Sequence, residues 1–591
     1  MKAFLGGLDL SEAVKLDCDP RAEMYDGVEV LCRGYIANPA ALMQEAQRRG
    51  ETLVSGSDAE LFAKAYGWWR DDLQSHVLGE FAVVIFDPRC RTLFLAHDAM
   101  GLVPLFYSPR RETIAFGSHL EHLLTRFGIG ALDEEYVADY LATGSVATER
   151  TPYIDFRRLL PGESLKWVDG RMMRLKTWDI ARVQPITLKD DREYEEHLRR
   201  LLDDAVTAAS RADGNVWVEL SGGLDSSTVA CVAAHLGAKP AGALSIVYST
   251  SSSADERKWI NTVVQERGLP WFALDADEAR PFSELPDHFC AEPAGVLPFA
   301  GLFRRYKDLA EANNVRVVLT GYGGDQIFCG GSPKPYYIAD HLPFRLRDLL
   351  RDIRAWQAGD PARRPFAYHL WRHVLIPSAN RWMGRSLSRP EVSRPPAWIR
   401  SEYGREKRLQ RRSARQVAPK CGSVGLQYQV EAVWKIAFTA GDDVTQGFEF
   451  RHPLLYRPLV EFMLAIPWKH KFCPESDRVL QRRALAGILP APISARTDKA
   501  GPAEAEAEGL RHNSPWAELL LRDARVVERG YVDARAWTHV VNQMRFGRMS
   551  SMRHFIATAA LEIWLRQLES FCPAPRNNAG LSIVSGVPFS K

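Results

Sequence analysis

One stretch decides the fold of this chain: Val216-Trp217-Val218-Glu219-Leu220, then Ser221-Gly222-Gly223-Leu224-Asp225-Ser226-Ser227, then the helix-like run Thr228-Val229-Ala230-Cys231-Val232-Ala233-Ala234. An apolar-leaning pentapeptide, a glycine-rich turn and a helical run predict a strand, a tight loop and a helix N-terminus. Such a loop binds anions, because backbone N–H groups converge on one point and the helix dipole adds positive charge there. The stretch therefore predicts a nucleotide phosphate site.

The side chains of this loop suit a nucleotide pyrophosphate accompanied by a metal ion. Its two glycines let the backbone approach a phosphate, and Ser221, Ser226 and Ser227 add hydroxyl donors. Asp225 would repel a phosphate unless a cation bridges the two, so it predicts a metal ion here. The loop lacks the lysine of the G-x-x-x-x-G-K-[ST] motif and is therefore not a P-loop. A turn that only caps the helix is the alternative, and the order of loop, acid and helix favours the phosphate site.

Further along the chain, apolar strands alternate with helical patterns, which predicts a parallel sheet with crossover helices. The runs 243–248 and 316–320 are the next clear strands, and ligands of such sheets lie beyond the carboxyl ends of the strands. Asp325, in the glycine-rich turn 320–328, is placed at such an end. Together with Asp225 it predicts two carboxylates that hold Mg²⁺ between phosphate oxygens of ATP. The residues expected to bind ATP are Leu220, Ser221, Gly222, Gly223, Asp225, Ser226, Ser227, Ile246, Thr320 and Gly321.

The composition is that of an ordinary soluble globular protein. Its 591 residues are enough for two or more domains, and the net charge of +3 gives no case for binding nucleic acid or a membrane. The nine cysteines are scattered and form no C-x-x-C pair, which predicts reduced thiols in a cytoplasmic protein rather than disulfides or a zinc site. The N-terminal apolar run is too short for a signal peptide, and no apolar run reaches the roughly 18 residues that span a membrane.

Four segments resemble the asparagine synthetase group of ATP-pyrophosphatase enzymes, which adenylate a carboxylate, release pyrophosphate and pass the acyl group to an amine. Residues 221–227 resemble the pyrophosphate loop of that group, and residues 320–328 its second signature. Residues 447–455 resemble the segment Gly-x-Glu-x-Arg-x-Pro-x-Leu, which implies that Glu449 faces the acyl-adenylate and helps to remove the proton of the amine. In the closing segment the resemblance implies that Lys499 neutralises charge on the phosphate and the tetrahedral intermediate.

Residues 1–180 read as rich in β-strands, with short apolar runs such as 28–32 and 81–86 bounded by turn residues. Segments 79–87 and 96–107 resemble the N-terminal glutaminase-type domain of asparagine synthetases. The resemblance implies a β-rich, Ntn-hydrolase-like sandwich of the class II glutamine amidotransferase type.

The departures from that resemblance concern the glutaminase chemistry itself. A glutaminase of this type uses an N-terminal cysteine as nucleophile, whereas position 2 is Lys2 and the first cysteine is Cys18. The acid that would hold the substrate ammonium is replaced by Tyr35, and Asp58 alone is left of the glutamine contacts. Without a thiolate there is no thioester and no ammonia. We therefore expect a scaffold domain without glutaminase activity, and an amine that comes from elsewhere.

These expectations combine into an α/β protein of two parts. The sandwich, a degenerate glutaminase, occupies residues 1–180, and a doubly wound, parallel-sheet ATP-pyrophosphatase domain with helical additions occupies residues 195–571. Residues 572–591 are poor in pattern and predict a mobile tail. The Arg- and Trp-rich stretch 341–425 contains a basic run at 400–415, which is either a solvated helix face or a docking surface for an acidic partner.

The resemblance implies amide formation with ATP and Mg²⁺ as cofactors, and three outcomes fit it: macrolactam closure as in lasso peptide cyclases, β-lactam closure on a small amino acid, or asparagine synthesis from free ammonia. We favour the first, because the long synthetase half exceeds the needs of a small substrate and because residues 254–257 and 268–270 look most like lasso cyclases. The implied partners are a leader-cleaved precursor peptide, a maturation protease and a leader-binding protein. A non-catalytic regulator is the contrasting class, and retention of Asp225, Asp325 and Lys499 argues against it.

Overall fold

The computed structural model describes most of the chain. Lys2, Lys499 and the tail predicted at 572–591 lie outside the described residues. Within the described part, no helix is long and apolar enough to cross a membrane. The described residues are 4–571 except 10–16, 20, 110–112, 169–170, 239, 251–254, 332–333, 388–394, 416, 440–446, 499–509, 512–513 and 547–551.

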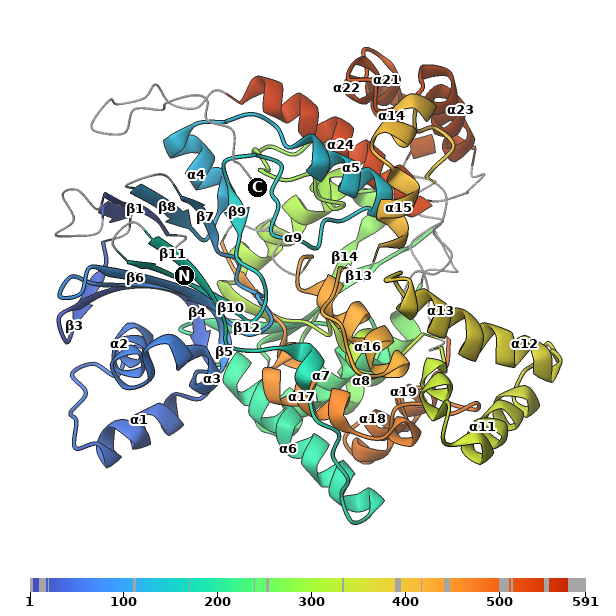
Figure 1. Cartoon of the computed structure of the whole chain (residues 1–591), viewed down its shortest axis with the longest axis horizontal. Coiled ribbons are helices and arrows are strands. Elements are labelled where there is room, and N and C mark those ends of the chain that lie inside the picture. Colours follow the sequence, from blue (N-terminus) through green and yellow to red (C-terminus); the bar gives the residue numbers. More distant parts are fainter. Residues whose placement is uncertain are drawn as a thin grey trace.

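The N-terminal part is a sandwich of two antiparallel sheets (Figure 1). Side chains of both sheets share one apolar core, as the predicted sandwich requires. Among the described residues, the first sheet has the order β2 (Asp17–Asp19), β1 (Leu5–Asp9), β8 (Thr113–Gly117), β7 (Phe106–Pro109), β9 (Arg157–Arg158), and the second has the order β11 (Arg171–Lys176), β10 (Glu163–Val168), β6 (Thr92–His97), β5 (Gly79–Asp87), β4 (Val28–Ile36), β3 (Glu23–Tyr25).

Strand β5 shows how its sequence produces this packing. Val84 and Phe86 point into the core between the sheets, whereas Val83 and Ile85 pack with helix α2 (Asp58–Trp69) on the opposite face. This two-residue alternation is the pleat of a strand, and both of its faces are covered. The strand therefore reads as an unbroken apolar run instead of an alternating one.

The second part is built on a parallel sheet. Every neighbouring pair of its strands runs parallel, which confirms the predicted doubly wound α/β class. Among the described residues the strand order is β14 (Trp271–Asp275), β13 (Gly242–Val247), β12 (Asn215–Glu219), β15 (Val315–Leu319), β16 (Glu449–Arg451).

This strand order contains a topological switch point. From β12 the chain moves outward through β13 to β14, and it then returns to place β15 on the other side of β12. Val218 of β12 lies opposite Leu319 of β15, so the loops that follow these two strands begin side by side. A crevice at such a point is where doubly wound sheets bind ligands.

Helices cover both faces of the parallel sheet. Val218 packs with the helices of one face and Trp217 with those of the other, because successive side chains of a strand point to opposite faces. The first face is covered by α6 (Asp191–Ala209), α7 (Leu224–His235) and α8 (Arg257–Arg267), and the second by α9 (Ala300–Ala312).

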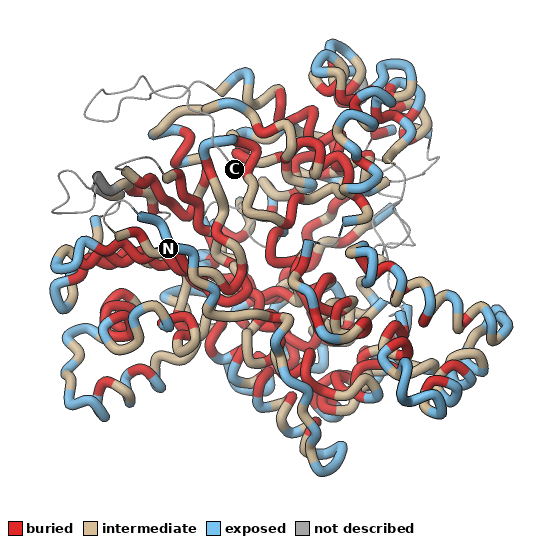
Figure 2. Tube along the Cα trace, in the orientation of Figure 1, coloured by how far each residue is buried: buried red, intermediate tan, exposed pale blue. Residues whose placement is uncertain are grey.

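A helical lobe projects beside this sheet, at the lower right of Figure 1, and Figure 2 shows much of its surface exposed. It comprises α11 (Leu346–Ala358), α12 (Phe366–Leu370), a π-helical turn (Trp371–Leu375) and α13 (Ile376–Trp382). The lobe falls within the Arg- and Trp-rich stretch of the sequence.

Part of the basic run at 400–415 makes an internal contact. Arg412, on α15 (Leu409–Ala414), donates to Asp139 at 2.7 Å and also pairs with Glu135, both on α5 (Glu134–Thr143). Neither interpretation of the sequence included this contact. The arginine joins the synthetase half to a helix of the N-terminal segment.

Candidate functional site

A cavity of about 910 Å³ opens at the carboxyl ends of β12 and β15, at the switch point. We call it the nucleotide cleft. Its position agrees with the expectation for ligands of parallel sheets. The predicted residues that line it are Leu220, Ser221, Gly223, Asp225, Ser226, Ile246, Gly321 and Asp325.

Three predicted ATP-binding residues do not line this cleft, and the structure shows another role for each while ATP binding by them stays a prediction. Gly222 has a φ of +72°, and a Cβ at this position would lie 2.6 Å from the Cβ of Trp259, so glycine is needed for the turn itself. The Ser227 side chain is fully buried in α7. The Thr320 hydroxyl lies 2.8 Å from Nδ1 of His452, in the interior. In the structure these residues support the two loops on the side away from the cleft.

The loops that follow β12 and β15 pack directly on each other. A Cβ on Gly321 would lie 2.5 Å from the backbone nitrogen of Ser226, and a Cβ on Gly324 would lie 2.3 Å from Cγ of Asp225. Both distances are far below van der Waals contact, so only glycine permits this approach. The glycines that the sequence suggested for ligand approach thus also bring the two acidic loops together.

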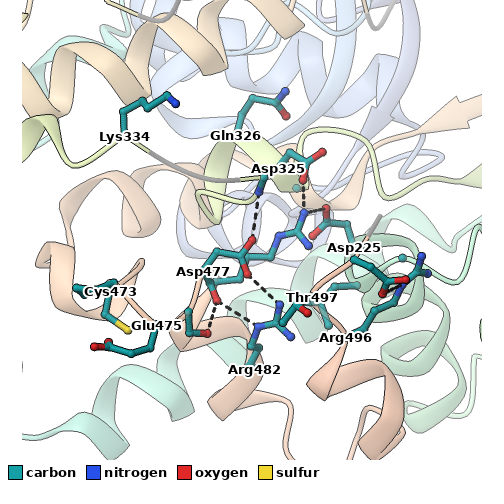
Figure 3. A pocket seen from close by; sticks show the side chains of 18 of the residues that line it. Asp225, Asp325, Gln326, Lys334, Cys473, Glu475, Asp477, Arg482, Arg496 and Thr497 are labelled. Atoms are coloured by element: carbon teal, nitrogen blue, oxygen red, sulfur yellow. Dashed lines mark hydrogen bonds and ion pairs between the residues drawn. The ribbon is translucent and has the colours of Figure 1, made fainter. Parts of the chain in front are cut away.

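The two aspartates predicted to bind a metal ion converge on one cation of the protein. Nη2 of Arg478 lies 3.0 Å from Oδ2 of Asp225 and also pairs with Oδ1 of Asp325 (Figure 3). Gln481 donates to the other oxygen of Asp225 at 3.2 Å. Arg478 directly precedes α18 (Val479–Ala484) and is largely buried. The structure brings the two aspartates together, their binding of a metal ion stays a prediction, and the sequence gave no role to the arginine.

This donor set fits a divalent cation. Two carboxylates that meet at one Nη2 atom are close enough to share an ion, and oxygen ligands are those that Mg²⁺ prefers. In the described part of the chain, no group of three or more His, Cys, Asp or Glu side chains could hold a metal alone.

Two further arginines line the cleft. Arg482 donates to Asp477 at 2.9 Å, and Arg496 donates to the carbonyl oxygen of Gly222 at 2.9 Å, directly beneath the phosphate loop. Lys499 lies outside the described residues, but the three residues that precede it, 496–498, line the cleft. The segment that precedes Lys499 therefore reaches the nucleotide cleft, and the role of Lys499 stays a prediction.

Glu449 is not brought to the aspartates. It lies opposite Val317, before the carboxyl end of β15, and its Oε2 is 3.1 Å from Nη2 of Arg451. It lines a second cavity, of about 1270 Å³, together with residues of the N-terminal sandwich such as Tyr35 and Asp58. In this structure Glu449 does not face the nucleotide cleft, because its strand position turns it toward the interface between the two parts.

That interface is closed by a buried polar cluster. Tyr35 donates to Oε1 of Glu80 at 3.2 Å, and the same oxygen accepts the backbone N–H of His452 at 2.7 Å. The guanidinium of Arg451 lies 4.3 Å above the Tyr35 ring. Burial raises the pKa of Glu80 to about 8. Tyr35, which replaces the expected acid, is thus a contact between the two parts of the chain.

The second cavity offers no thiol. Among the described residues that line it there is no cysteine. Cys32 lies on β4, beside the residues of that strand that line the cavity. Its thiol stays protonated, because burial raises its pKa to about 12. The expected absence of glutaminase activity stays a prediction.

Comparison with known proteins agrees with this architecture. The sequence pattern of the family described as Asparagine synthase matches residues 197–566, and that described as Glutamine amidotransferase domain matches residues 13–178. Glutamine-hydrolyzing asparagine synthetase 3 of Bacillus subtilis (strain 168) is 24% identical over 533 residues, covering 85% of this chain and 80% of that protein.

Two other relatives match over about half of their length. Glutamine-hydrolyzing asparagine synthetase 1 of the same organism is 24% identical over 55% of this chain and 52% of its own. Amidase chyE of Penicillium rubens is 28% identical over 47% of this chain and 43% of its own. With one family pattern spanning more than half of the sequence, the chain belongs to the asparagine synthase family, whose ATP-dependent, AMP-forming amide ligases it joins.

Proposed function

We propose that the protein closes a macrolactam ring in a peptide. ATP would activate the side-chain carboxylate of an Asp or Glu in the substrate, and the N-terminal amine of the same leader-cleaved peptide would attack it. The family supplies the general chemistry of ATP-dependent amide formation. The choice of a peptide as substrate rests on the shape of the site.

The observation that carries the proposal is the extent of the nucleotide cleft. The same cavity that begins at Ser221 continues to the helical lobe, where Trp356, Arg364 and His369 line it. At about 910 Å³ it lies at the upper end of the range of small-ligand pockets, roughly 300–1,000 Å³. A cleft of this reach has room for a peptide segment beside a nucleotide.

A second observation concerns the source of the amine. The cavity at the N-terminal sandwich has no lining thiol among its described residues, and Tyr35 stands where an acid would hold a glutamine ammonium. An amine carried by the substrate needs neither group. Tethering amine and carboxylate in one peptide also raises their effective concentration, which lowers the barrier to ring closure.

The activation step can be assigned to groups of the chain. A carboxylate oxygen attacks the α-phosphorus, the bond to pyrophosphate breaks, and an acyl-adenylate forms. The phosphate loop and Arg482 would hold the phosphates, and Asp225 and Asp325 would hold Mg²⁺, which supplies charge neutralisation to the departing pyrophosphate. The amine then attacks the acyl carbon, AMP leaves, and the nitrogen releases a proton.

The test is a reaction with ATP, Mg²⁺, a candidate precursor peptide and its maturation protease, with the leader-binding protein present or absent. We expect AMP, pyrophosphate and a product lighter by one water that resists exopeptidase, and neither in Asp325→Asn. Unchanged peptide together with turnover of aspartate and ammonia would replace the proposal by asparagine synthesis. Cyclisation of a small β-amino acid alone would replace it by a β-lactam synthetase.

A further inference from the structure

One helix of the lobe turns an apolar face outward. Helix α12, the π-helical turn and α13 follow one another without a break, so that residues 366–382 form one helix. The inner face of this helix is occupied, because His369 and His373 line the nucleotide cleft and Val374 is buried in the core of the lobe. We call the opposite side the outer face of the lobe helix.

The outer face has the wrong composition for a helix surface that stays in water. Exposed positions of a surface helix are normally polar or charged. Residues 366–382 are all described, and of their exposed positions only Arg381 is charged. The other exposed positions are Ala367, Trp371, Leu375, Ala379 and Trp382.

The two tryptophans make this face a strong candidate for binding. Trp371 is 60% exposed and Trp382 is 88% exposed. Burying such large rings against a partner is favourable, and tryptophan is enriched among the residues that contribute most to protein interfaces. The face therefore suits a partner that covers both rings.

The relief of the outer face suits a helix. Trp371, Leu375 and Ala379 follow at intervals of four residues, which is the ridge that packs into the grooves of another helix. Trp371 and Trp382 lie roughly 15 Å apart along the helix axis. The small side chain of Ala379 leaves a dip before the second ring, where a partner helix can approach closely. A lipid surface would gain nothing from such a dip.

The charge of the lobe selects an acidic partner. Residues 345–385 contain nine arginines, three aspartates and no lysine or glutamate, a net charge of +6 in a chain whose total is +3. The three aspartates are shared between two of the arginines, Arg351 and Arg364. Beside the outer face, Arg381 donates to the carbonyl oxygens of Cys421 and Gly422, which leave its positive charge in place. The surplus attracts and orients acidic groups of a partner.

We propose that the outer face of the lobe helix docks an acidic amphipathic helix of a partner protein, with Trp371 and Trp382 as the anchors. The arginines of the lobe face the acids of that helix. Because the opposite side of the lobe helix lines the nucleotide cleft, the partner binds next to the reaction site without occupying it. The inference does not depend on which amide the enzyme forms.

The experiment titrates the full chain into a labelled helical peptide and follows fluorescence anisotropy. The probe is a repeat of Glu-Leu-Leu-Glu-Glu-Leu-Glu heptads, and its counterpart has lysine in place of every glutamate. The Glu peptide should bind at least about tenfold more tightly than the Lys peptide, and added salt should weaken it. Trp371→Ala and Trp382→Ala should each weaken the Glu peptide about tenfold, as expected for interface anchors.

Phe546→Ala is the matched control, since Phe546 is an aromatic residue outside the lobe and is 75% exposed. It should bind the Glu peptide like the unaltered protein, and unfolding temperature checks that all three variants are folded. No binding, equal binding of both peptides, or an equal loss in Phe546→Ala would overturn the docking site. Binding to phosphatidylserine vesicles in place of the peptide would assign the face to a membrane instead. A dimer that Trp382→Ala abolishes would assign it to a second copy of the chain, and either result would also overturn the proposal.

Discussion

Replacing Arg478 by Ala should open the acid pair to a metal ion in the absence of nucleotide. In the structure Nη2 of Arg478 bonds to Asp225 at 3.0 Å and to Asp325 as well, so a metal ion competes with a guanidinium for the same oxygens. Each bond to a charged group contributes about 1.5–3 kcal/mol when buried. The Asp325 side chain is 35% exposed, which reduces its share. We therefore expect a competition of about 2 kcal/mol, or roughly 30-fold in metal affinity.

The assay is a Mn²⁺ titration of the nucleotide-free protein, followed by electron paramagnetic resonance of the free ion. Arg478→Ala should bind Mn²⁺ about 30-fold more tightly than the unaltered protein. Without metal it should be less stable by about 2 kcal/mol, because two neighbouring carboxylates lose their cation. Added Mn²⁺ should restore much of that stability, since an ion that binds the folded state stabilises it.

The matched control is Arg483→Ala, on α18, the helix that Arg478 directly precedes. Arg483 also bonds two carboxylates, those of Asp191 and Glu195, but it lies outside the cleft and is 37% exposed. Its loss should cost no more than about 1 kcal/mol and leave Mn²⁺ binding unchanged. Equal Mn²⁺ affinity in the unaltered protein and in Arg478→Ala would refute the competition between arginine and metal.

Gly321→Ala should abolish nucleotide binding and destabilise the fold by roughly 2 kcal/mol or more, because its Cβ would lie 2.5 Å from the backbone nitrogen of Ser226. The control is Gly295→Ala, whose Cβ would meet nothing within 4 Å. It should behave like the unaltered protein in nucleotide titration and in thermal unfolding. Glu80 has its pKa raised by burial to about 8, so the folded protein keeps a proton that the unfolded chain releases above its ordinary pKa of about 4.5. The free energy of unfolding should therefore fall as pH rises from about 5 to 8, and Glu80→Gln should flatten that dependence in thermal unfolding. An unchanged pH dependence in Glu80→Gln would show that the buried contact between Glu80 and His452 does not form in solution.

The phosphate loop could be predicted because its requirements are local. A strand, two glycines and a helix N-terminus follow one another within a dozen residues, although α7 begins at Leu224 and so includes Asp225, which the sequence placed in the loop before a helix from Thr228. Asp325 could be paired with it because parallel strands present their carboxyl ends at one edge. Arg478 was missed, since its role depends on α18 arriving across the cleft from more than 250 residues away, and no short-range pattern encodes that approach.

The helical lobe was visible only as a biased composition. Its arginines and tryptophans gave no prediction of structure, and nothing in the spacing of His369 predicts a buried ring that faces a cavity. That burial depends on how α12 packs in three dimensions, which no short-range pattern in the sequence encodes.

The misplacement of Glu449 points to what the N-terminal sandwich does for the synthetase half. Strand β16 is short and lies at the edge of the parallel sheet, with β15 as its neighbour. Short edge strands need cover, and here Glu80 and Tyr35 of the sandwich bond to or stack on the residues at the end of β16.

That end is coupled to the nucleotide cleft. His452 donates its backbone N–H to Glu80, and its ring contacts the hydroxyl of Thr320. Thr320 directly precedes Gly321, which lines the cleft. A sandwich without glutaminase chemistry would therefore still be required to hold the second acidic loop in place. This gives a physical reason for such a domain to be retained: removing it would expose β16 and release the loop that carries Asp325.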